Sequence, residues 1–168
     1  TALPTWTSHR HFRKLVRDLD YFVLQAHSTE KPKSPDSPIV LCDTARIPGW
    51  LHDLRKIKTA YYLALPTYGY HVVFSGTGGF VGLIAENAAV LQPREGYRIR
   101  SVIADPAAIA STVRWLRLQR PKGCRGIAWF RMPIATDQLN WAWPTVRAVM
   151  QGRTPRHSYA AEIRHPEP

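Results

Sequence analysis

Apolar residues recur at the i, i+3 and i+4 spacing of one helix face in four parts of the chain, which predicts amphipathic helices. The four segments are residues 8–20, 43–58, 105–121 and 144–150. Polar residues in position to cap the first three are Ser8, Asp43 or Thr44, and Asp105. Pro106 occupies the first helical position after Asp105, where proline is favoured, so the third segment is the clearest helix.

Short apolar runs between these helices predict strands. The runs are residues 1–6, 21–27, 60–68 and 125–133. Strands that alternate with helices in this way imply parallel pairing through crossover helices. A βαβ step takes about 30 residues or more. The recurrence of "ALPTW" (residues 2–6) as "ALPTY" (residues 64–68) therefore places the two words on alternate strands of one sheet, unless the recurrence is chance.

The pattern changes after the third predicted strand. Apolar runs flank the glycines of "GTGG", so residues 70–86 predict a β-hairpin, and residues 97–103 alternate as a third strand of the same insertion. The segment "STEKPKSPDSP" at residues 28–38 carries four charges and three prolines, so we expect it to be exposed and mobile.

These elements predict an α/β fold: the C-terminal half of a (β/α)8 TIM-like barrel, about four βα units, with a small antiparallel β insertion at about residues 69–104. We expect the half-barrel domain to span residues 1–151, and residues 152–168 to form a partly disordered tail. The chain opens inside a predicted strand, so we expect a piece of a longer protein. Four units cannot close a barrel, so the expected partner is the missing N-terminal barrel half or a second copy of the chain.

The carboxyl ends of the strands form the working face of such a fold, and period-two alternation sorts the side chains that reach it. Residues predicted to gather at this mouth are Trp6, Gln25, His27, Tyr68, Tyr70, Trp129 and Arg131, with Asp137, Asn140, Trp141 and Trp143 in the loop that follows. Aromatic walls with a few hydrogen-bonding groups suit a sugar, which has apolar ring faces and hydroxyl edges. The alternatives are plain packing for the aromatic residues, a structural hydrogen bond for His27 and an ion pair between Arg131 and Asp137.

Charge and cysteine content narrow the classes of partner. Lys plus Arg outnumber Asp plus Glu by 23 to 12, and the formal net charge of +11 favours anionic partners or surfaces. The basic residues are spread over predicted outer helix faces without any nucleic-acid-binding motif, so nucleic acid is a disfavoured partner. No apolar run approaches the roughly 20 residues of a membrane span. Cys42 and Cys124 fall toward opposite ends of the strands, so we expect two free thiols.

The predicted mouth lacks the residues that glycoside cleavage needs. That reaction usually takes two carboxylates, and the mouth offers only Asp137, while Glu30, Asp36 and Glu86 lie in predicted loops. The sequence also has no Gly-x-Ser-x-Gly elbow, phosphate-cradling loop or His/Cys metal cluster, so we expect neither a cofactor nor a metal. The predicted mouth has residues that can bind a ligand but shows no means of catalysis, and whether the protein is an enzyme stays open.

The stretches "ALPTYGY", "RGIAWFRMP" and "LNWAWPTVRAVM" resemble a bacterial family, the domain of unknown function 3142 family, and this resemblance runs over nearly all of the chain. A more distant resemblance is to glycoside hydrolase family 18, the chitinase-like barrels. "LALPTYGY" is similar to that family's Gly-x-Pro-x-Tyr-Gly-Arg strand end, with Tyr70 in place of Arg, and Trp129 matches the tryptophan of its last strand. "DYFVLQAHS" is similar to its Asp-Tyr-x-x-x-Met-x-Tyr-Asp strand, with Gln25, His27 and Ser28 in place of Met, Tyr and Asp.

The resemblance implies the carbohydrate-facing half of a glycosidase-like protein whose general acid lies outside this chain. Trp129, Tyr68 and Trp6 would be stacking platforms, and His27, Gln25 and Arg131 polar contacts. The first alternative is a non-catalytic glycan-binding or cell-envelope accessory domain, and the second is a basic nucleic-acid-binding domain. A bacterial source is implied, with the compartment open and export expected only if the full-length protein carries a signal.

Overall fold

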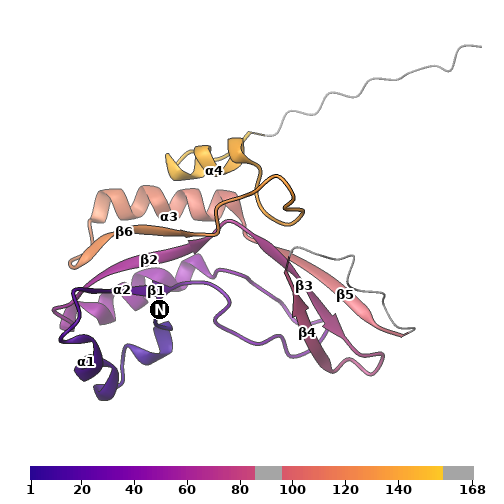
Figure 1. The fold of residues 1–168 in the computed structure, drawn as a ribbon, viewed down its shortest axis with the longest axis horizontal. Coiled ribbons are helices and arrows are strands. Elements are labelled where there is room, and N and C mark those ends of the chain that lie inside the picture. Colours follow the sequence, from indigo (N-terminus) through magenta and orange to yellow (C-terminus); the bar gives the residue numbers. More distant parts are fainter. Residues whose placement is uncertain (86–95, 157–168) are drawn as a thin grey trace, which may run out of the picture.

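Three parallel strands form the central sheet of the computed structural model, which describes residues 1–85 and 96–156 (Figure 1). The strands are β1 (Tyr21–Gln25), β2 (Ala60–Pro66) and β6 (Cys124–Phe130), and β2 lies between the other two. Gln25 pairs with Ala64, and Ala64 pairs with Ala128, so the carboxyl ends of the strands meet at one edge. The predicted parallel pairing of these strands is confirmed, and the fold is mixed α/β.

The first predicted strand is reduced to a single residue. Ala2 forms an isolated parallel bridge to β1, in which its N–H donates to Val23 O over 2.7 Å and its C=O accepts from Gln25 N over 2.8 Å. The chain then turns into a 3-10 helix, η1 (Pro4–Trp6), whose leading proline has no N–H to offer a sheet. The strand predicted over residues 1–6 is therefore wrong beyond Ala2, and the described residues do not confirm a half-barrel of four βα units.

The repeated word thus takes two conformations from equivalent starting points. Ala2 O accepts from Gln25 N, while Ala64 O accepts from Ala26 N over 3.1 Å, so the two alanines flank the end of β1 from opposite sides. The second copy stays extended through Pro66 because β2 has strands on both sides to hold it. Ala2 and Ala64 therefore occupy equivalent positions, as predicted, whereas the residues that follow them do not.

In the described residues, four α-helices form at the predicted helical segments, and the last begins one residue earlier than predicted. They are α1 (Arg10–Val16), α2 (Ile47–Asp53, between the 3-10 turns η2 Thr44–Arg46 and η3 Leu54–Lys56), α3 (Pro106–Gln119) and α4 (Trp143–Met150). Asp43 and Asp105 accept backbone N–H groups at the starts of η2 and α3, as predicted. Ser8 does not cap α1, because that helix begins two residues later, after His9, and the Ser8 hydroxyl donates to Thr5 O instead.

One face of the parallel sheet is buried against the helices. Leu24, Leu63 and Leu65 have no measurable exposure there, and Phe22 meets Phe12 of α1 edge to face with ring centroids 5.4 Å apart. Figure 1 shows α3 running alongside β6, with α4 packed against α3. Leu63 and Leu65 thus face the helices, and the alternate residues of β1 and β2 lie on the opposite face.

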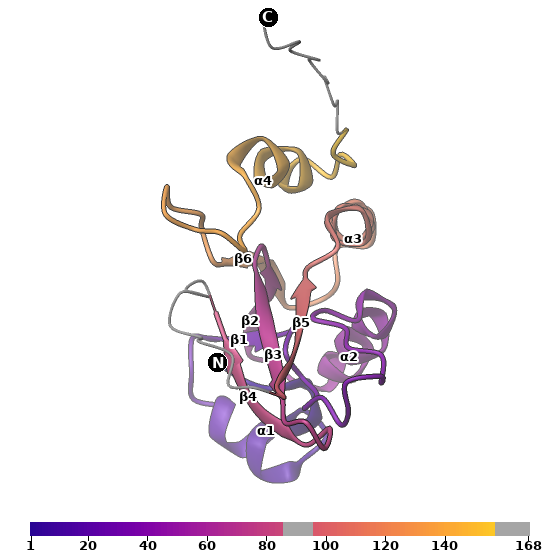
Figure 2. The same ribbon diagram turned by 90° about the vertical axis from the view of Figure 1, so that its right-hand side faces the viewer.

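A second, antiparallel sheet follows β2. It consists of β3 (Gly69–Phe74), β4 (Phe80–Ile84) and β5 (Arg98–Ile103) in the order β4-β3-β5, and Figure 2 looks at the molecule from the side where this sheet lies. Only Thr67 and Tyr68 separate β2 from β3, so the sheet borders the carboxyl end of the parallel strands. Residues 86–95 of the predicted insertion, and the predicted tail from residue 157, lie outside the described residues.

The segment over residues 28–38 is packed onto the antiparallel sheet, in contrast to the expected exposed loop. Arg100 of β5 donates to Pro35 O and, over 2.6 Å, to Ser37 O. Lys31 lies 4.6 Å from the ring centroid of Phe80 on β4, and Pro35 is buried. The prediction of exposure was based on the composition of the segment alone. Composition does not reveal contacts with residues far along the chain, such as Arg100 and Phe80.

The structure also bears on the cysteines and on membrane-spanning helices. Cys42 and Cys124 are both free, as predicted. Within the described ranges, no helix is long and apolar enough to cross a membrane.

Gly69, the first residue of β3, has no room for a side chain. A Cβ atom there would lie 2.6 Å from Val102 O on β5, whereas a Cβ at Gly82 on β4 would meet nothing within 4 Å. We expect Gly69→Ala to lower the free energy of unfolding by about 1–3 kcal/mol, because the two strands must separate to admit the methyl group. Gly82→Ala is the matched control and should be neutral or slightly stabilising. Urea unfolding measures both, and equal effects would contradict the close approach of β3 and β5.

Candidate functional site

A small cavity lies at the carboxyl ends of the three parallel strands, where the sequence places the mouth. We name it the strand-end hollow; it has a volume of about 280 Å³. It is lined by Thr1, Val23, Gln25, His27, Ala64, Tyr68, Ala128, Trp129 and Phe130. This volume is close to the lower end of the range of about 300–1,000 Å³ for small-molecule sites. Four of the predicted mouth residues, Gln25, His27, Tyr68 and Trp129, therefore border one cavity.

His27 follows β1 and is 4% exposed. Its Nδ1 atom lies 3.3 Å from Tyr68 Oη, and its ring stacks on Phe130 with centroids 5.4 Å apart and 15° between the planes. Its Nε2 atom has no hydrogen-bond partner in the part of the chain that the structure describes. Burial disfavours the imidazolium and lowers the pKa of His27 to about 4. His27 is thus a neutral ring at neutral pH, with one nitrogen left over for a ligand.

Tyr68 is the hydrogen-bond partner of the His27 Nδ1 atom. Its hydroxyl lies between His27 Nδ1 and Ser28 Oγ, which is 3.1 Å away. Ser28 has a left-handed φ of 51°, and its N–H donates to Leu41 O over 2.7 Å, so its position is fixed by the backbone. Burial raises the pKa of Tyr68, which keeps the phenol protonated. If Ser28 donates to Tyr68 and Tyr68 donates to Nδ1, then Nε2 carries the imidazole proton and acts as a donor.

Phe130 takes the place that the sequence prediction gives to Trp129. The register pairs Trp129 with Leu65 and Phe130 with Pro66, and neighbouring partners in a sheet share a face. Trp129 therefore lies on the face of Leu65 and packs partly against the core, although it still borders the hollow. Phe130 lies on the opposite face, is 51% exposed, and contacts both His27 and Tyr68. The predicted orientation of Trp129 is wrong by one residue.

A sequence signal for this register was present. Small residues such as alanine suit the crowded inner face of such a sheet, and Ala128 pairs directly with Ala64. Period-two alternation from Ala128 places Phe130, two residues later, on that inner face.

The residue set Arg131, Asp137 and Asn140 forms a separate polar cluster beyond the end of β6. Arg131 and Asp137 form an ion pair, and Asp137 Oδ2 also accepts from Ile134 N over 2.9 Å and from Asn140 Nδ2 over 3.1 Å. Burial acts to raise the pKa of Asp137, but these hydrogen bonds and the guanidinium outweigh it and lower the pKa. The ion-pair alternative is confirmed, and none of the three residues lines the strand-end hollow.

The remaining predicted mouth residues lie elsewhere. Trp141 is 6% exposed and donates its indole N–H to Ala104 O over 2.9 Å, and Tyr70 is 4% exposed, so both are packing residues. Trp6 is turned away by η1 and borders a separate shallow groove with Phe12 and Leu15 of α1.

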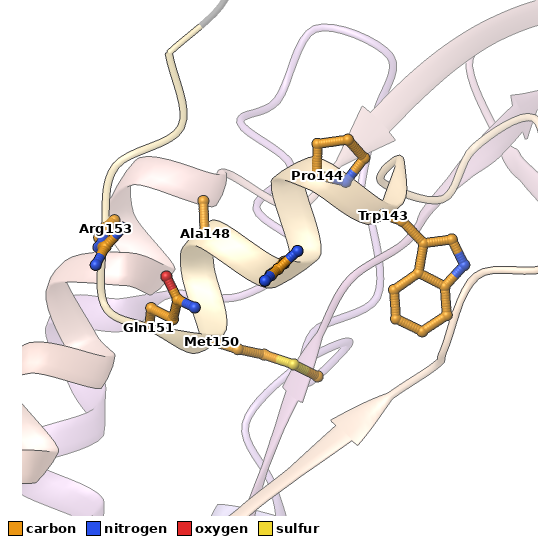
Figure 3. A pocket seen from close by; sticks show the side chains of 7 residues that line it. Trp143, Pro144, Ala148, Met150, Gln151 and Arg153 are labelled. Carbon is orange, nitrogen blue, oxygen red and sulfur yellow. The ribbon is translucent and has the colours of Figure 1, made fainter.

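A larger, open cleft of about 830 Å³ runs along α4 (Figure 3). Its lining includes Trp143, Arg147, Met150 and Arg153, and Figure 3 shows the side chains of Trp143 and Met150 extending from the helix. Trp143 is 54% exposed. The cleft belongs to the helix layer rather than to the strand ends, so we assign the candidate site to the strand-end hollow. Among the described residues, no group of three or more His, Cys, Asp or Glu side chains is arranged to hold a metal ion.

Comparison with known proteins gives a family and a fold. The family described as "Domain of unknown function (DUF3142)" matches residues 1–135. No curated protein matches the sequence significantly. The crystal structure of a chitinase from Chromobacterium violaceum is similar to this chain with a TM-score of 0.50 and 15% sequence identity, over 86% of this chain and 49% of the chitinase. The chitinase ChiA74 from Bacillus thuringiensis gives a TM-score of 0.47 and 9% identity, over 92% of this chain and 35% of that protein.

The first of these similarities concerns the fold alone. It agrees with the distant resemblance of the sequence to glycoside hydrolase family 18, because the two structures share their arrangement despite low identity. The chain spans about half the length of that chitinase.

Proposed function

The chain belongs to the DUF3142 family, and from this premise we propose that it is the carbohydrate-facing portion of a glycosidase-like barrel and binds a glycan in the strand-end hollow. The observation that carries the proposal is the hollow itself. It combines an exposed aromatic ring, Phe130, with polar groups of His27, Gln25 and Tyr68 at the ends of parallel strands. The fold shared with a chitinase supports a sugar as the ligand.

The chemistry of the hollow matches the two surfaces of a sugar ring. Phe130 offers an apolar face for the C–H side of the ring, and its orientation is fixed by stacking on His27. His27 Nε2 and the Gln25 amide offer hydrogen bonds to hydroxyl groups at the ring edge. The Gln25 Nε2 atom donates to His27 O over 3.0 Å, which leaves its carbonyl oxygen as an acceptor. The small side chains of Ala64 and Ala128, which are paired at the base of the hollow, leave room for a sugar ring.

We further propose that other βα units, from the missing N-terminal half or a second copy of the chain, complete the barrel around this hollow. The inner face of the parallel sheet supports this, because Tyr21 and Phe130 are each 51% exposed on it. The general acid of a glycosidase would then come from those units.

A non-catalytic glycan-binding domain is the second candidate. No carboxylate is among the side chains that line the hollow in the described residues. The nearby Asp137 is held by Arg131, Asn140 and Ile134 N, so it is not placed as a free acid or base. Both candidates predict that this chain alone binds a glycan without cleaving it.

Replacing Phe130 with Ala should weaken glycan binding about tenfold or more, because central aromatic contacts carry much of the binding energy of a site. Trp143→Ala is the matched control: Trp143 is 54% exposed, close to the 51% of Phe130, but lies on α4 outside the hollow. Calorimetry with cellohexaose and N-acetylchitohexaose measures both variants, with circular dichroism to confirm folding.

Two outcomes would contradict the proposal. Binding that is lost in Trp143→Ala and kept in Phe130→Ala would move the site to α4. Absence of binding to either glycan would remove the carbohydrate function. Release of shorter sugars by the chain alone would exclude the non-catalytic candidate and the expectation that the acid lies outside the chain.

A further inference from the structure

Resting on the proposed function, we propose that the strand-end hollow accepts uncharged glycans and rejects acidic ones, although the protein as a whole is strongly basic. The inference names the class of sugar: hexoses and acetylated amino sugars enter, whereas uronates and phosphorylated or sulfated sugars do not.

No described side chain that lines the hollow is a charged counter-ion to an acidic group. Its side chains are aliphatic, aromatic, amide or hydroxyl, and His27 is the one basic side chain among them. His27 is 4% exposed and is packed between Phe130 and Tyr68, with its Nδ1 engaged by the Tyr68 hydroxyl. A carboxylate that enters this space loses water and gains no cation, which costs binding energy.

The histidine stays uncharged where binding would be measured. Burial lowers its pKa to about 4, so the ring is neutral at pH 7 and does not provide the missing cation. Tyr68 stays protonated because burial raises its pKa. Two neutral groups that donate or accept hydrogen bonds suit hydroxyl and acetamido groups of a sugar.

The arginine that follows Phe130 in the sequence, Arg131, is already in an ion pair. Its guanidinium pairs with Asp137, whose side chain is 4% exposed. Turning Arg131 toward a ligand would leave that buried carboxylate without its partner, at a cost similar to the gain. The ion pair therefore supplies no net positive charge to the hollow.

Basic residues are abundant outside the hollow, so the expected rejection of acidic glycans applies to the hollow and not to the protein surface as a whole. The formal net charge of +11 attracts acidic polymers to the surface as a whole. Surface attraction of this kind is screened by salt within a few ångströms near 1 M and about 10 Å near 0.1 M. Binding in the hollow should persist in salt, and surface binding should not.

The test uses β-1,4-linked hexasaccharides that share one backbone: cellohexaose, N-acetylchitohexaose and the glucuronic acid hexamer, measured by calorimetry at pH 7 in about 0.5 M NaCl. We expect an uncharged hexamer to bind about tenfold or more tightly than the glucuronate. Gln25→Lys adds a cation inside the hollow and should shrink the ratio by several-fold. Gln151→Lys adds the same charge at an exposed position just after α4 and should not change the ratio.

The outcomes separate this inference from the function on which it rests. Glucuronate binding as tight as that of cellohexaose, and lost in Phe130→Ala, would overturn charge rejection while leaving a glycan site in place. An unchanged ratio in folded Gln25→Lys would also overturn it, because the lining would then not set the preference. Failure of all three hexamers to bind would end both proposals.

Discussion

Lowering the pH from about 7.5 to about 4 should remove about 3 kcal/mol of unfolding free energy from the wild-type chain through His27 alone. Burial lowers the pKa of His27 in the folded chain from 6.5 to about 4. Between those two values the unfolded chain binds a proton that the folded chain does not, so acid favours unfolding. The contribution is fully present above about pH 6.5 and is lost as the pH falls to 4. Urea unfolding at several pH values measures the slope.

Two variants identify the source of the slope. In His27→Gln, the loss of unfolding free energy between about pH 7.5 and about pH 4 should be about 3 kcal/mol smaller than in wild type. Tyr68→Phe removes the hydroxyl at Nδ1 but keeps the ring that buries His27, so it should retain the slope, since burial is the cause. A wild-type slope equal to that of His27→Gln would show that the folded protein does not hold a neutral His27.

Leu63→Ala should lower the free energy of unfolding by about 2–5 kcal/mol. Leu63 is the middle of the central strand, has no measurable exposure, and lies between Leu24 on β1 and Ile127 on β6. Shortening it leaves a cavity between three strands that cannot all move inward. Leu118→Ala on α3 is the control, since Leu118 is 81% exposed, and should change the unfolding free energy by less than about 0.5 kcal/mol. A loss below about 1 kcal/mol for Leu63→Ala would contradict the packed helix side of the sheet.

The order and direction of the strands could be predicted because they follow from alternating periodicity. The apolar runs that became β1, β2 and β6 are separated by helical spacing, which leaves parallel pairing as the simplest arrangement. The same logic placed His27 and Tyr68 at one edge, where they do meet. Each position depends on local pattern alone.

Trp6 could not be placed in this way, and Trp129 was placed on the wrong face of its strand. The position of Trp6 depends on whether a proline ends a strand or starts a turn. The same four residues, Ala-Leu-Pro-Thr, recur at 64–67, where β2 stays extended through its proline, which shows that neighbouring strands decide this. The position of Trp129 depends on the register of one strand, and a register irregularity between Tyr61 and Tyr62 shifts the pairing with β6. A slip of one residue exchanges the two faces of a strand.

Contacts of Arg100 with the segment over residues 28–38 also bear on how relatives of this chain can differ in length. The segment begins at Ser28, whose hydroxyl contacts the Tyr68 hydroxyl and whose N–H donates to Leu41 O, just beyond the end of the segment. Ser28 and Leu41 therefore anchor the two ends of this stretch. An insertion or deletion between those anchors would shift the support beneath His27. The Ser75–Gly79 tip of the β3–β4 hairpin packs beside the same segment, since a Cβ atom at Gly78 would lie 3.5 Å from Pro35 Cδ. Evolutionary drift in loop length should therefore spare both the proline-rich segment and this hairpin tip.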